Sequence, residues 1–219
     1  MNKKKILYFA LMFLPLLITV IALPFLPEQI PAHYNFAGEV DRIGSKFEML
    51  IFPLCTIGMG SFMLWMAKIA AKQEENGNNN EKIVFYTGMG ISVWFTVIFC
   101  HSLFKAFQFK SAMSYSFEAD INQLVCILLG IGLVVTGNFM PKLRNNGIIG
   151  LRTPWSMKND ITWKKCQLFG GISFIICGAV MIALGIFMEG YTAMCAALGL
   201  LIVDTIICVI YSYKIAKKY

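Results

Sequence analysis

The chain has 219 residues, of which 58% are hydrophobic and only 14% are charged. Soluble domains are about 45–50% hydrophobic and about 25% charged, so this composition excludes an ordinary soluble domain and indicates a membrane protein. The formal net charge of +7 would suit direct nucleic-acid binding, but the basic residues gather at the ends of apolar segments, where they set membrane topology. The seven cysteines are scattered without a CxxC pair or a Cys/His cluster, so the sequence indicates neither a disulfide framework nor a metal site, and we expect no cofactor.

Six apolar segments are each long enough to cross a hydrocarbon core of about 30 Å as a helix. In chain order they cover residues 6–26, 47–69, 83–104, 119–139, 168–188 and 191–213. The first follows three lysines, as a secretory signal would, but it is too long for one and lacks a small-x-small cleavage site. The sequence therefore predicts an all-α polytopic membrane protein with six transmembrane helices.

The distribution of lysine and arginine predicts how these helices are oriented. If the N-terminus lies inside, fifteen of the nineteen basic residues fall on the cytoplasmic side and four fall outside. Cytoplasmic loops are enriched in basic residues. The N- and C-termini are therefore predicted to be cytoplasmic. The protein is predicted to be a multi-pass protein of the plasma membrane, embedded in the lipid bilayer.

The connections between the helices are unequal and suggest a modular organisation. The predicted units, in order, are a two-helix module (1–69) with an outer loop (27–46), a polar cytoplasmic linker (70–82), a four-helix module (83–213) with an inner loop (140–167), and a basic tail (214–219). The outer and inner loops are the longest and chemically the richest connections. Binding residues are concentrated in such loops, so we expect the function there.

The outer loop has the composition of a shaped segment. Pro27 and Pro31 hold the residues before them in extended geometry, and Gly38 and Gly44 permit tight turns. This shape would allow three polar side chains to converge, namely His33, Asn35 and Asp41. One interpretation is that these groups only satisfy the backbone of their own loop. The other is that they form a binding surface.

A third interpretation of the outer loop is that it binds a metal ion or catalyses a reaction. His33 and Asp41 could hold a metal ion with a third ligand from His101, Glu118 or Asp120. Hydrolysis would need a nucleophile beside a positioned base, and none is visible. His101 lies near the outer end of the third helix, so both histidines fall on one side of the membrane, where a proton-sensitive pair could form.

The apolar segments themselves contain two notable features. Asp204 lies inside the sixth segment, where an ionised carboxylate costs about 2.5–3.5 kcal/mol, so it is expected to face the bundle interior, be protonated or pair with a polar group. Glycines recur in the helices, and Gly171, Gly178 and Gly185 are seven residues apart. Small residues let membrane helices approach closely, which predicts a tight bundle.

The inner loop is basic and is punctuated by residues that favour turns. It carries six lysines and arginines against one aspartate, and Gly147, Gly150 and Pro154 interrupt it. Trp155 and Trp163 suit the membrane interface, so part of this composition is explained by a topological anchor. Proline after a threonine at residues 153–154 is typical of the first turn of a helix. A short anchor would not need these turn residues.

Three sequence stretches of this loop resemble a known family. They are Gly-Asn-Phe-Met-Pro-Lys-Leu-Arg-Asn-Asn (137–146), Gly-Leu-Arg-Thr-Pro-Trp-Ser-Met (150–157) and Thr-Trp-Lys-Lys (162–165). Together they resemble the signature of the SdpI family of bacterial immunity membrane proteins. The outer loop resembles the small uncharacterised domain that commonly precedes that signature, so the resemblance covers residues 8–62 and 118–213.

The resemblance implies a six-helix plasma-membrane protein, without enzymatic activity, that protects cells from a secreted peptide toxin. It also implies signalling by capture of a cytoplasmic transcriptional repressor. On this reading the toxin would bind the outer loop at His33, Asn35, Gly38 and Asp41. Partner-binding or structural residues of the inner loop would be Asn138, Pro141, Arg144, Gly150, Arg152, Thr153, Pro154, Trp155 and Trp163.

One departure from the family pattern and two other functions stay open. After the second tryptophan the family usually continues with threonine, histidine and a basic residue, whereas this chain has Cys166, Gln167 and Leu168. A proton-coupled transporter of small solutes is favoured by Asp204, although no second charge inside the membrane is available to relay a proton. A membrane-embedded hydrolase or metalloenzyme would have to use His33, Asp41 and His101.

Overall fold

A computed structural model describes residues 3–35, 39–72, 79–111 and 121–219. Within these ranges the chain forms six long helices: α1 (Lys3–Ala22), α2 (Ile51–Lys72), α3 (Asn79–Ser111), α4 (Ile121–Phe139), α5 (Asp160–Phe187) and α6 (Gly190–Lys218). All six are long and apolar enough to cross a membrane. The predicted all-α fold with six membrane-spanning helices is therefore confirmed.

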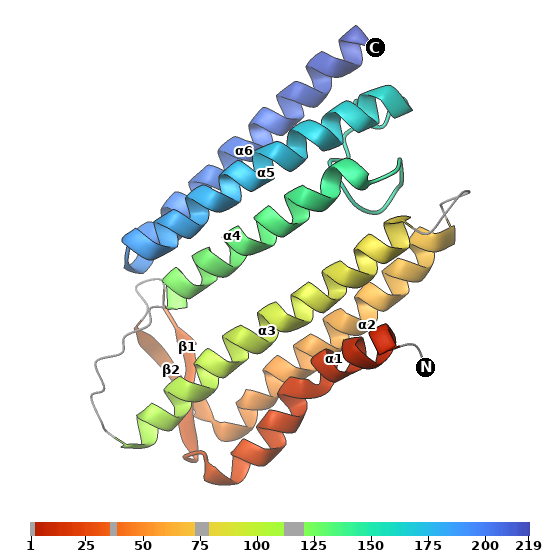
Figure 1. Cartoon of the computed structure of the whole chain (residues 1–219). Helices are drawn as coiled ribbons and strands as arrows, with labels where there is room; N and C mark the ends of the chain where they lie inside the picture. The colour runs from red at the N-terminus through yellow and green to blue at the C-terminus, as the bar shows by residue number, and fades with distance from the viewer. Residues whose placement is uncertain (1–2, 36–38, 73–78, 112–120) are drawn as a thin grey trace.

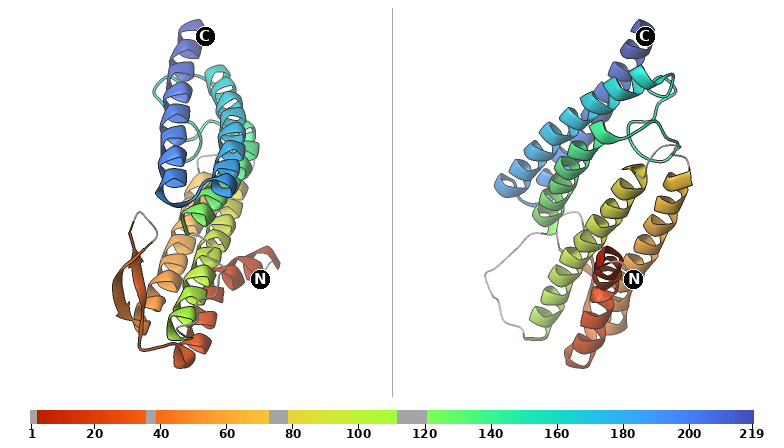
Figure 2. Two further views of the ribbon diagram at one scale, coloured as in Figure 1. Left: turned by 90° about the vertical axis from the view of Figure 1, so that its left-hand side faces the viewer. Right: turned by 45° about the vertical axis from the view of Figure 1, so that its right-hand side comes forward.

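Successive helices alternate in direction and pack as two groups (Figure 1). α3 packs mainly along α2 and α1, whereas α4 packs mainly along α5, and α6 covers α5 and α4. The two groups lie beside each other along α3 and α4, and the further views in Figure 2 show the same division. The segment between α4 and α5 lies at one end of the molecule, and the segment between α1 and α2 lies at the other.

Glycines bring α4 and α5 into backbone contact. A β-carbon placed on Gly130 would lie 2.6 Å from the carbonyl oxygen of Gly178, and one on Gly137 would lie 2.5 Å from that of Gly171. The partners run in opposite directions along the two helices, as antiparallel packing requires. The seven-residue spacing of the glycines therefore places each one against its partner on the same helix face.

A tyrosine fixes α1 against the first group of helices. The Tyr8 side chain is 1% exposed, and its hydroxyl donates a 2.8 Å hydrogen bond to the carbonyl oxygen of Gly60 on α2. A β-carbon on Gly88 of α3 would lie only 2.3 Å from that hydroxyl. Large side chains inserted against glycines thus pack the first group, whereas α4 and α5 meet backbone to backbone.

The connection between α1 and α2 folds into an antiparallel hairpin of two strands, β1 (Gln29–Tyr34) and β2 (Val40–Ser45). Short 3-10 helices flank it, η1 (Leu23–Phe25) and η2 (Lys46–Leu50). The sequence predicted extended geometry here but not strand pairing. Ile30 is 1% exposed and packs in a cluster with Leu26, Met49, Phe99 and Ala106. The hairpin is thereby attached to the end of α3.

The segment between α4 and α5 differs from the sequence-based expectation in two ways. α5 begins at Asp160 rather than at residue 168, because the Asn159 side chain caps it and accepts a 2.8 Å hydrogen bond from the backbone N–H of Thr162. No helix begins at residues 153–154, where one was expected. The chain makes only a single turn there, in which the Met157 N–H donates a 3.1 Å hydrogen bond to the Thr153 carbonyl. Another 3-10 helix, η3 (Met140–Lys142), ends α4.

Candidate functional site

At the hairpin, two of the predicted site residues form a direct pair. His33 Nδ1 and Asp41 Oδ1 lie 2.6 Å apart across the two strands, and their side chains are 63% and 43% exposed. The pair therefore bridges the two strands, and both side chains remain exposed on the surface of the protein. The expected convergence of His33 and Asp41 is present, although the contact they make is with each other.

Asn35 binds Glu39 across the open ends of the same two strands. Its side-chain oxygen accepts a 2.9 Å hydrogen bond from the Glu39 N–H, and its side-chain nitrogen donates a 3.0 Å bond to the Glu39 carboxylate. The Asn35 N–H also donates to the Glu39 carbonyl at 2.8 Å. Asn35 thus has a structural role in joining the ends of the two strands. Gly38, the fourth predicted toxin-binding residue, lies outside the described residues.

Ion pairs hold the base of the hairpin. Arg42 donates two hydrogen bonds to the Glu48 carboxylate, at 2.8 and 3.2 Å, and this interaction raises the pKa of the Arg42 guanidinium. Lys46 reaches the carboxylate of Glu28 at 2.7 Å. From Glu28 to Glu48 the sequence has four carboxylates and two basic residues, which leaves a net charge of −2 with histidine neutral.

The hairpin also exposes apolar side chains. Val40 and Ile43 are 43% and 52% exposed. The hairpin and the adjoining η2 therefore combine a net negative charge with accessible apolar area. A cationic peptide with an apolar side matches both properties.

The inner loop, at the opposite end, is organised by buried side chains that bind its backbone. Trp163 is 1% exposed, and its indole N–H donates a 2.8 Å hydrogen bond to the Leu143 carbonyl. The Asn146 side-chain oxygen accepts from the N–H groups of Ile148 and Ile149 at 2.7 and 2.8 Å. Trp163 was expected at the membrane interface, but its burial instead makes it part of the loop's core.

Gln167 fixes the middle of the loop. It is 0% exposed; its side-chain oxygen accepts from the Leu151 N–H at 2.9 Å, and its nitrogen donates to the Leu151 carbonyl at 3.0 Å. Gly150 has a φ of +107°, and a β-carbon there would lie 2.6 Å from the Gln167 side-chain oxygen. Glycine is therefore required at residue 150 for both conformation and space.

The single turn after Leu151 is stabilised by two hydroxyl side chains. The Thr153 N–H donates to Ser156 Oγ at 2.8 Å, and the Ser156 N–H donates to Thr153 Oγ1 at 2.9 Å. Thr153 Oγ1 also lies 2.9 Å from Ser212 Oγ, which connects the loop to α6. Pro154, which begins this turn, is exposed.

Several motif residues remain on the surface of the inner end. Asn138 is exposed and donates back to the Val134 carbonyl of its own helix at 2.9 Å. Pro141 packs near α5, because a β-carbon on Gly171 would lie 3.0 Å from its ring. Trp155 is 38% exposed and makes an edge contact with the ring of Tyr213, at 5.2 Å between centroids.

The two arginines of the inner loop are also exposed and differ in how they are held. Arg144 is tied to α3 through its backbone, whose N–H donates to the Asn80 side-chain oxygen at 3.2 Å and whose carbonyl accepts from Asn80 at 3.3 Å. Arg152 reaches the Ile148 carbonyl through one guanidinium nitrogen at 3.5 Å. The loop therefore presents cationic side chains from an ordered backbone.

The polar groups inside the helices have different surroundings. Asp204 is 6% exposed and accepts a short hydrogen bond from the Ser173 hydroxyl of α5, so it faces the bundle interior and pairs with a polar group, as expected. His101 is half-buried on α3. Among the described residues, no three His, Cys, Asp or Glu side chains are grouped closely enough to hold a metal ion; Glu118 and Asp120 lie outside those residues.

The residues that organise the inner loop were mostly missed by the sequence analysis. They are polar residues with 8% exposure or less: Asn80, Asn146, Ser156 and Gln167. The Asn-Gly pair at 146–147 is a turn signal, and a glutamine between apolar residues of a helix is a signal for a buried polar contact. Nothing in the sequence, however, identifies their partners.

Known proteins match the chain over both loops. Residues 10–57 match a domain of unknown function (DUF1648), and residues 142–212 match the SdpI/YfhL protein family. The immunity protein SdpI of Bacillus subtilis (strain 168) is 24% identical over 216 residues, which cover 99% of this chain and 97% of that protein. No solved structure matches. With the motif in the inner loop, these matches show that this multi-pass membrane protein is similar to the SdpI/YfhL family, most directly over residues 142–212.

Proposed function

We propose that this protein is an immunity protein of the plasma membrane that protects its cell from a secreted peptide toxin. The observation that most supports this proposal is the similarity to the Bacillus subtilis immunity protein, which extends over 99% of the chain. It includes the hairpin as well as the inner loop, so the likeness is not limited to one motif. The protein would act by binding rather than by catalysis.

The hairpin is proposed as the toxin-binding surface. At its end of the molecule it is larger than the connection between α5 and α6, which is a short turn at Met188 and Glu189. Its net charge of −2 attracts a cationic peptide, and its exposed Val40 and Ile43 can contact the apolar side of that peptide. The His33–Asp41 pair would provide the central polar contact, because it is accessible and held in place by the strands.

Toxin binding at the hairpin is tested by survival under peptide challenge in a sensitive host, normalised to the amount of protein in the membrane. We expect His33→Ala and Asp41→Ala each to abolish protection, since binding energy is concentrated in a few residues. Gln29→Ala is the matched control, because Gln29 is an exposed polar residue of the same strand outside the pair. Full protection by both pair variants would exclude this pair as the recognition site.

This proposal requires the hairpin to be extracellular and the inner loop to be cytoplasmic. The basic residues favour that orientation, with fifteen of nineteen on the inner-loop side. In a cysteine-free background, Ser45→Cys should react with a membrane-impermeant thiol reagent in intact cells, and Lys217→Cys should react only after lysis. Labelling of Lys217→Cys in intact cells would overturn the orientation.

A cytoplasmic transcriptional repressor is proposed as the partner of the inner loop. The loop is ordered by buried hydrogen bonds and presents Arg144 and Trp155 on its surface. Such a surface suits an acidic partner, and an ordered one loses little conformational entropy on binding. The test is whether a winged-helix repressor encoded beside this gene moves to the membrane fraction when toxin is added. Its movement in cells lacking this protein would contradict the proposal.

A further inference from the structure

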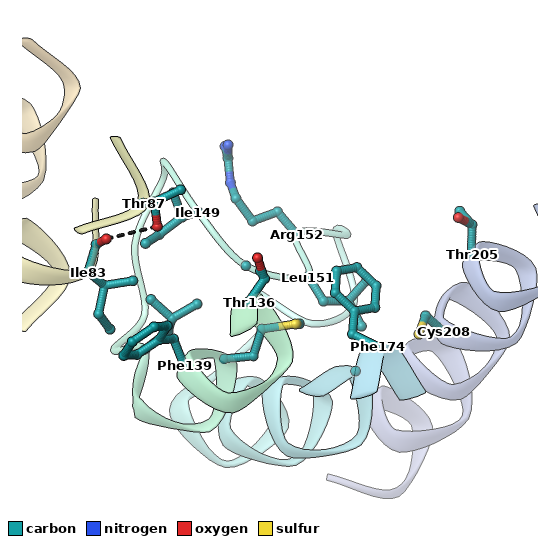
Figure 3. Close-up of a pocket in the computed structure, with 14 residues that line it drawn as sticks. Ile83, Thr87, Thr136, Phe139, Ile149, Leu151, Arg152, Phe174, Thr205 and Cys208 are labelled. Atoms are coloured by element: carbon teal, nitrogen blue, oxygen red, sulfur yellow. Dashed lines mark hydrogen bonds between the residues drawn. The ribbon is translucent and has the colours of Figure 1, made fainter. Parts of the chain in front are cut away.

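A cavity of about 340 Å³ lies where the inner loop meets the helices (Figure 3). Its volume is within the range of roughly 300–1,000 Å³ that is typical of ligand sites. Five elements contribute to its lining: Ile83 and Thr87 come from α3, Thr136 and Phe139 from α4, Leu151 and Arg152 from the inner loop, Phe174 from α5, and Thr205 and Cys208 from α6. The cavity therefore adjoins both groups of helices.

The wall of the cavity is mainly apolar, and two of its three threonine hydroxyls are engaged within their own helices. The Thr87 hydroxyl donates to the Ile83 carbonyl, and the Thr205 hydroxyl donates to the Leu201 carbonyl, each at 2.8 Å within its own helix. These donors are thus already used. The remaining lining includes Phe139, Met140, Leu151 and Phe174, so the interior suits a hydrocarbon group.

A single cationic side chain stands at the rim of this apolar wall. Among the described residues that line the cavity, only Arg152 is charged. In Figure 3 its side chain extends away from the apolar lining while its backbone stays beside Leu151. The guanidinium is exposed, and its 3.5 Å contact with the Ile148 carbonyl is at the long limit of a hydrogen bond. Arginine binds phosphate oxygens with two parallel donors.

We propose that this cavity binds an anionic phospholipid from the leaflet on the inner-loop side, with an acyl chain in the cavity and the phosphate on Arg152. An apolar wall and one cationic rim residue match the two chemical parts of such a lipid. Basic pockets between membrane helices are known to bind anionic head groups. Inorganic phosphate could make the same contact with Arg152 but would leave the apolar wall unused. The proposal does not depend on toxin immunity.

The test uses the full-length protein, purified in a neutral detergent and examined by native mass spectrometry. Phosphatidylglycerol is compared with phosphatidylethanolamine carrying the same acyl chains. We expect phosphatidylglycerol to bind about tenfold more tightly, because both lipids carry the phosphate but the ammonium group of phosphatidylethanolamine offsets its charge and is repelled by the Arg152 guanidinium. Arg152→Gln should remove this preference. Lys164→Gln, which removes a positive charge from an exposed residue outside the cavity, should keep it.

A second variant tests the cavity itself. Thr136→Phe places an aromatic ring in the lining and should weaken binding of both lipids while leaving Arg152 in place. The proposal is overturned if Arg152→Gln retains the preference, if the two lipids bind wild type equally, or if Thr136→Phe binds them as wild type does. Binding of inorganic phosphate as tightly as phosphatidylglycerol would instead show that the acyl chain adds nothing and would identify phosphate alone as the ligand.

Discussion

The two ends of this molecule are stabilised by opposite kinds of interaction. The hairpin depends on charged side chains that remain accessible, such as His33 with Asp41 and Arg42 with Glu48. The inner loop depends on buried, uncharged groups that bind backbone, such as Gln167 on Leu151. Exposed ion pairs contribute little to stability and weaken with salt, whereas buried donors and acceptors are costly to leave unpaired.

This difference makes the hairpin adaptable and the inner loop rigid. A surface held by exposed pairs can exchange its internal contacts for contacts with a ligand at small cost. A loop held by buried hydrogen bonds keeps one conformation, because each alternative leaves polar groups unsatisfied. The proposed binding of a toxin by the hairpin and of a partner by the inner loop would use this difference.

The largest effect should come from Gly150→Ala. Its φ of +107° strains an L-residue, and the added β-carbon would displace the Gln167 side chain, so we expect a loss of at least about 3 kcal/mol. Gly190→Ala is the matched control: its φ is +61°, but a β-carbon there has no neighbour within 4 Å, and the loss should be about 1–2 kcal/mol. Unfolding by SDS titration in mixed micelles measures both. Equal losses would show that Gln167 adds nothing.

A smaller effect should follow from Gln167→Leu. The change leaves the Leu151 N–H without its side-chain acceptor, whereas the Leu151 carbonyl keeps the Ser156 hydroxyl at 2.7 Å, so we expect a loss of about 2 kcal/mol. Hydrogen exchange at residues 151–157 should accelerate. Gln167→His can keep one of the two bonds, so its loss should be smaller. A histidine variant as unstable as the leucine variant would contradict this account.

The smallest effect should come from the His33–Asp41 pair. A double-mutant cycle with His33→Ala and Asp41→Ala should give a coupling energy below about 1 kcal/mol, because both side chains are exposed. High salt should reduce it further. Survival under toxin challenge should nevertheless be lost in each single variant. A large coupling energy that does not change with salt would remove the proposed contrast between the two ends.

Sequence reasoning succeeded best where one property repeats along the chain. Long apolar runs fix the six helices, because a membrane span must satisfy its own backbone hydrogen bonds. It was less accurate where a polar side chain decides a local structure. Asn159 starts α5 before the apolar run begins, and the hairpin forms from a segment that the sequence predicted only to be extended. Caps and strand pairing depend on single contacts rather than on periodic pattern.

The candidate sites show the same limit. The residues of the hairpin pair could be proposed from sequence because His33 and Asp41 lie eight positions apart in one shaped loop. The importance of Asn80 for the inner loop could not, because its partner Arg144 is 64 residues away. The cavity was equally inaccessible, since its lining comes from residues 83 to 208 and is assembled only when the helices pack.

The sequence by itself determined the membrane class, the six helices, the family motif and the glycine spacing that permits close packing. Each of these follows from composition or from a local pattern. Only the tertiary structure decided which glycines meet: Gly130 faces Gly178, and Gly137 faces Gly171. It also placed Arg152 at the rim of an apolar cavity and Gln167 on the backbone of Leu151. A glycine or a buried amide specifies what it can contact, but the packing of distant helices decides which partner is within reach.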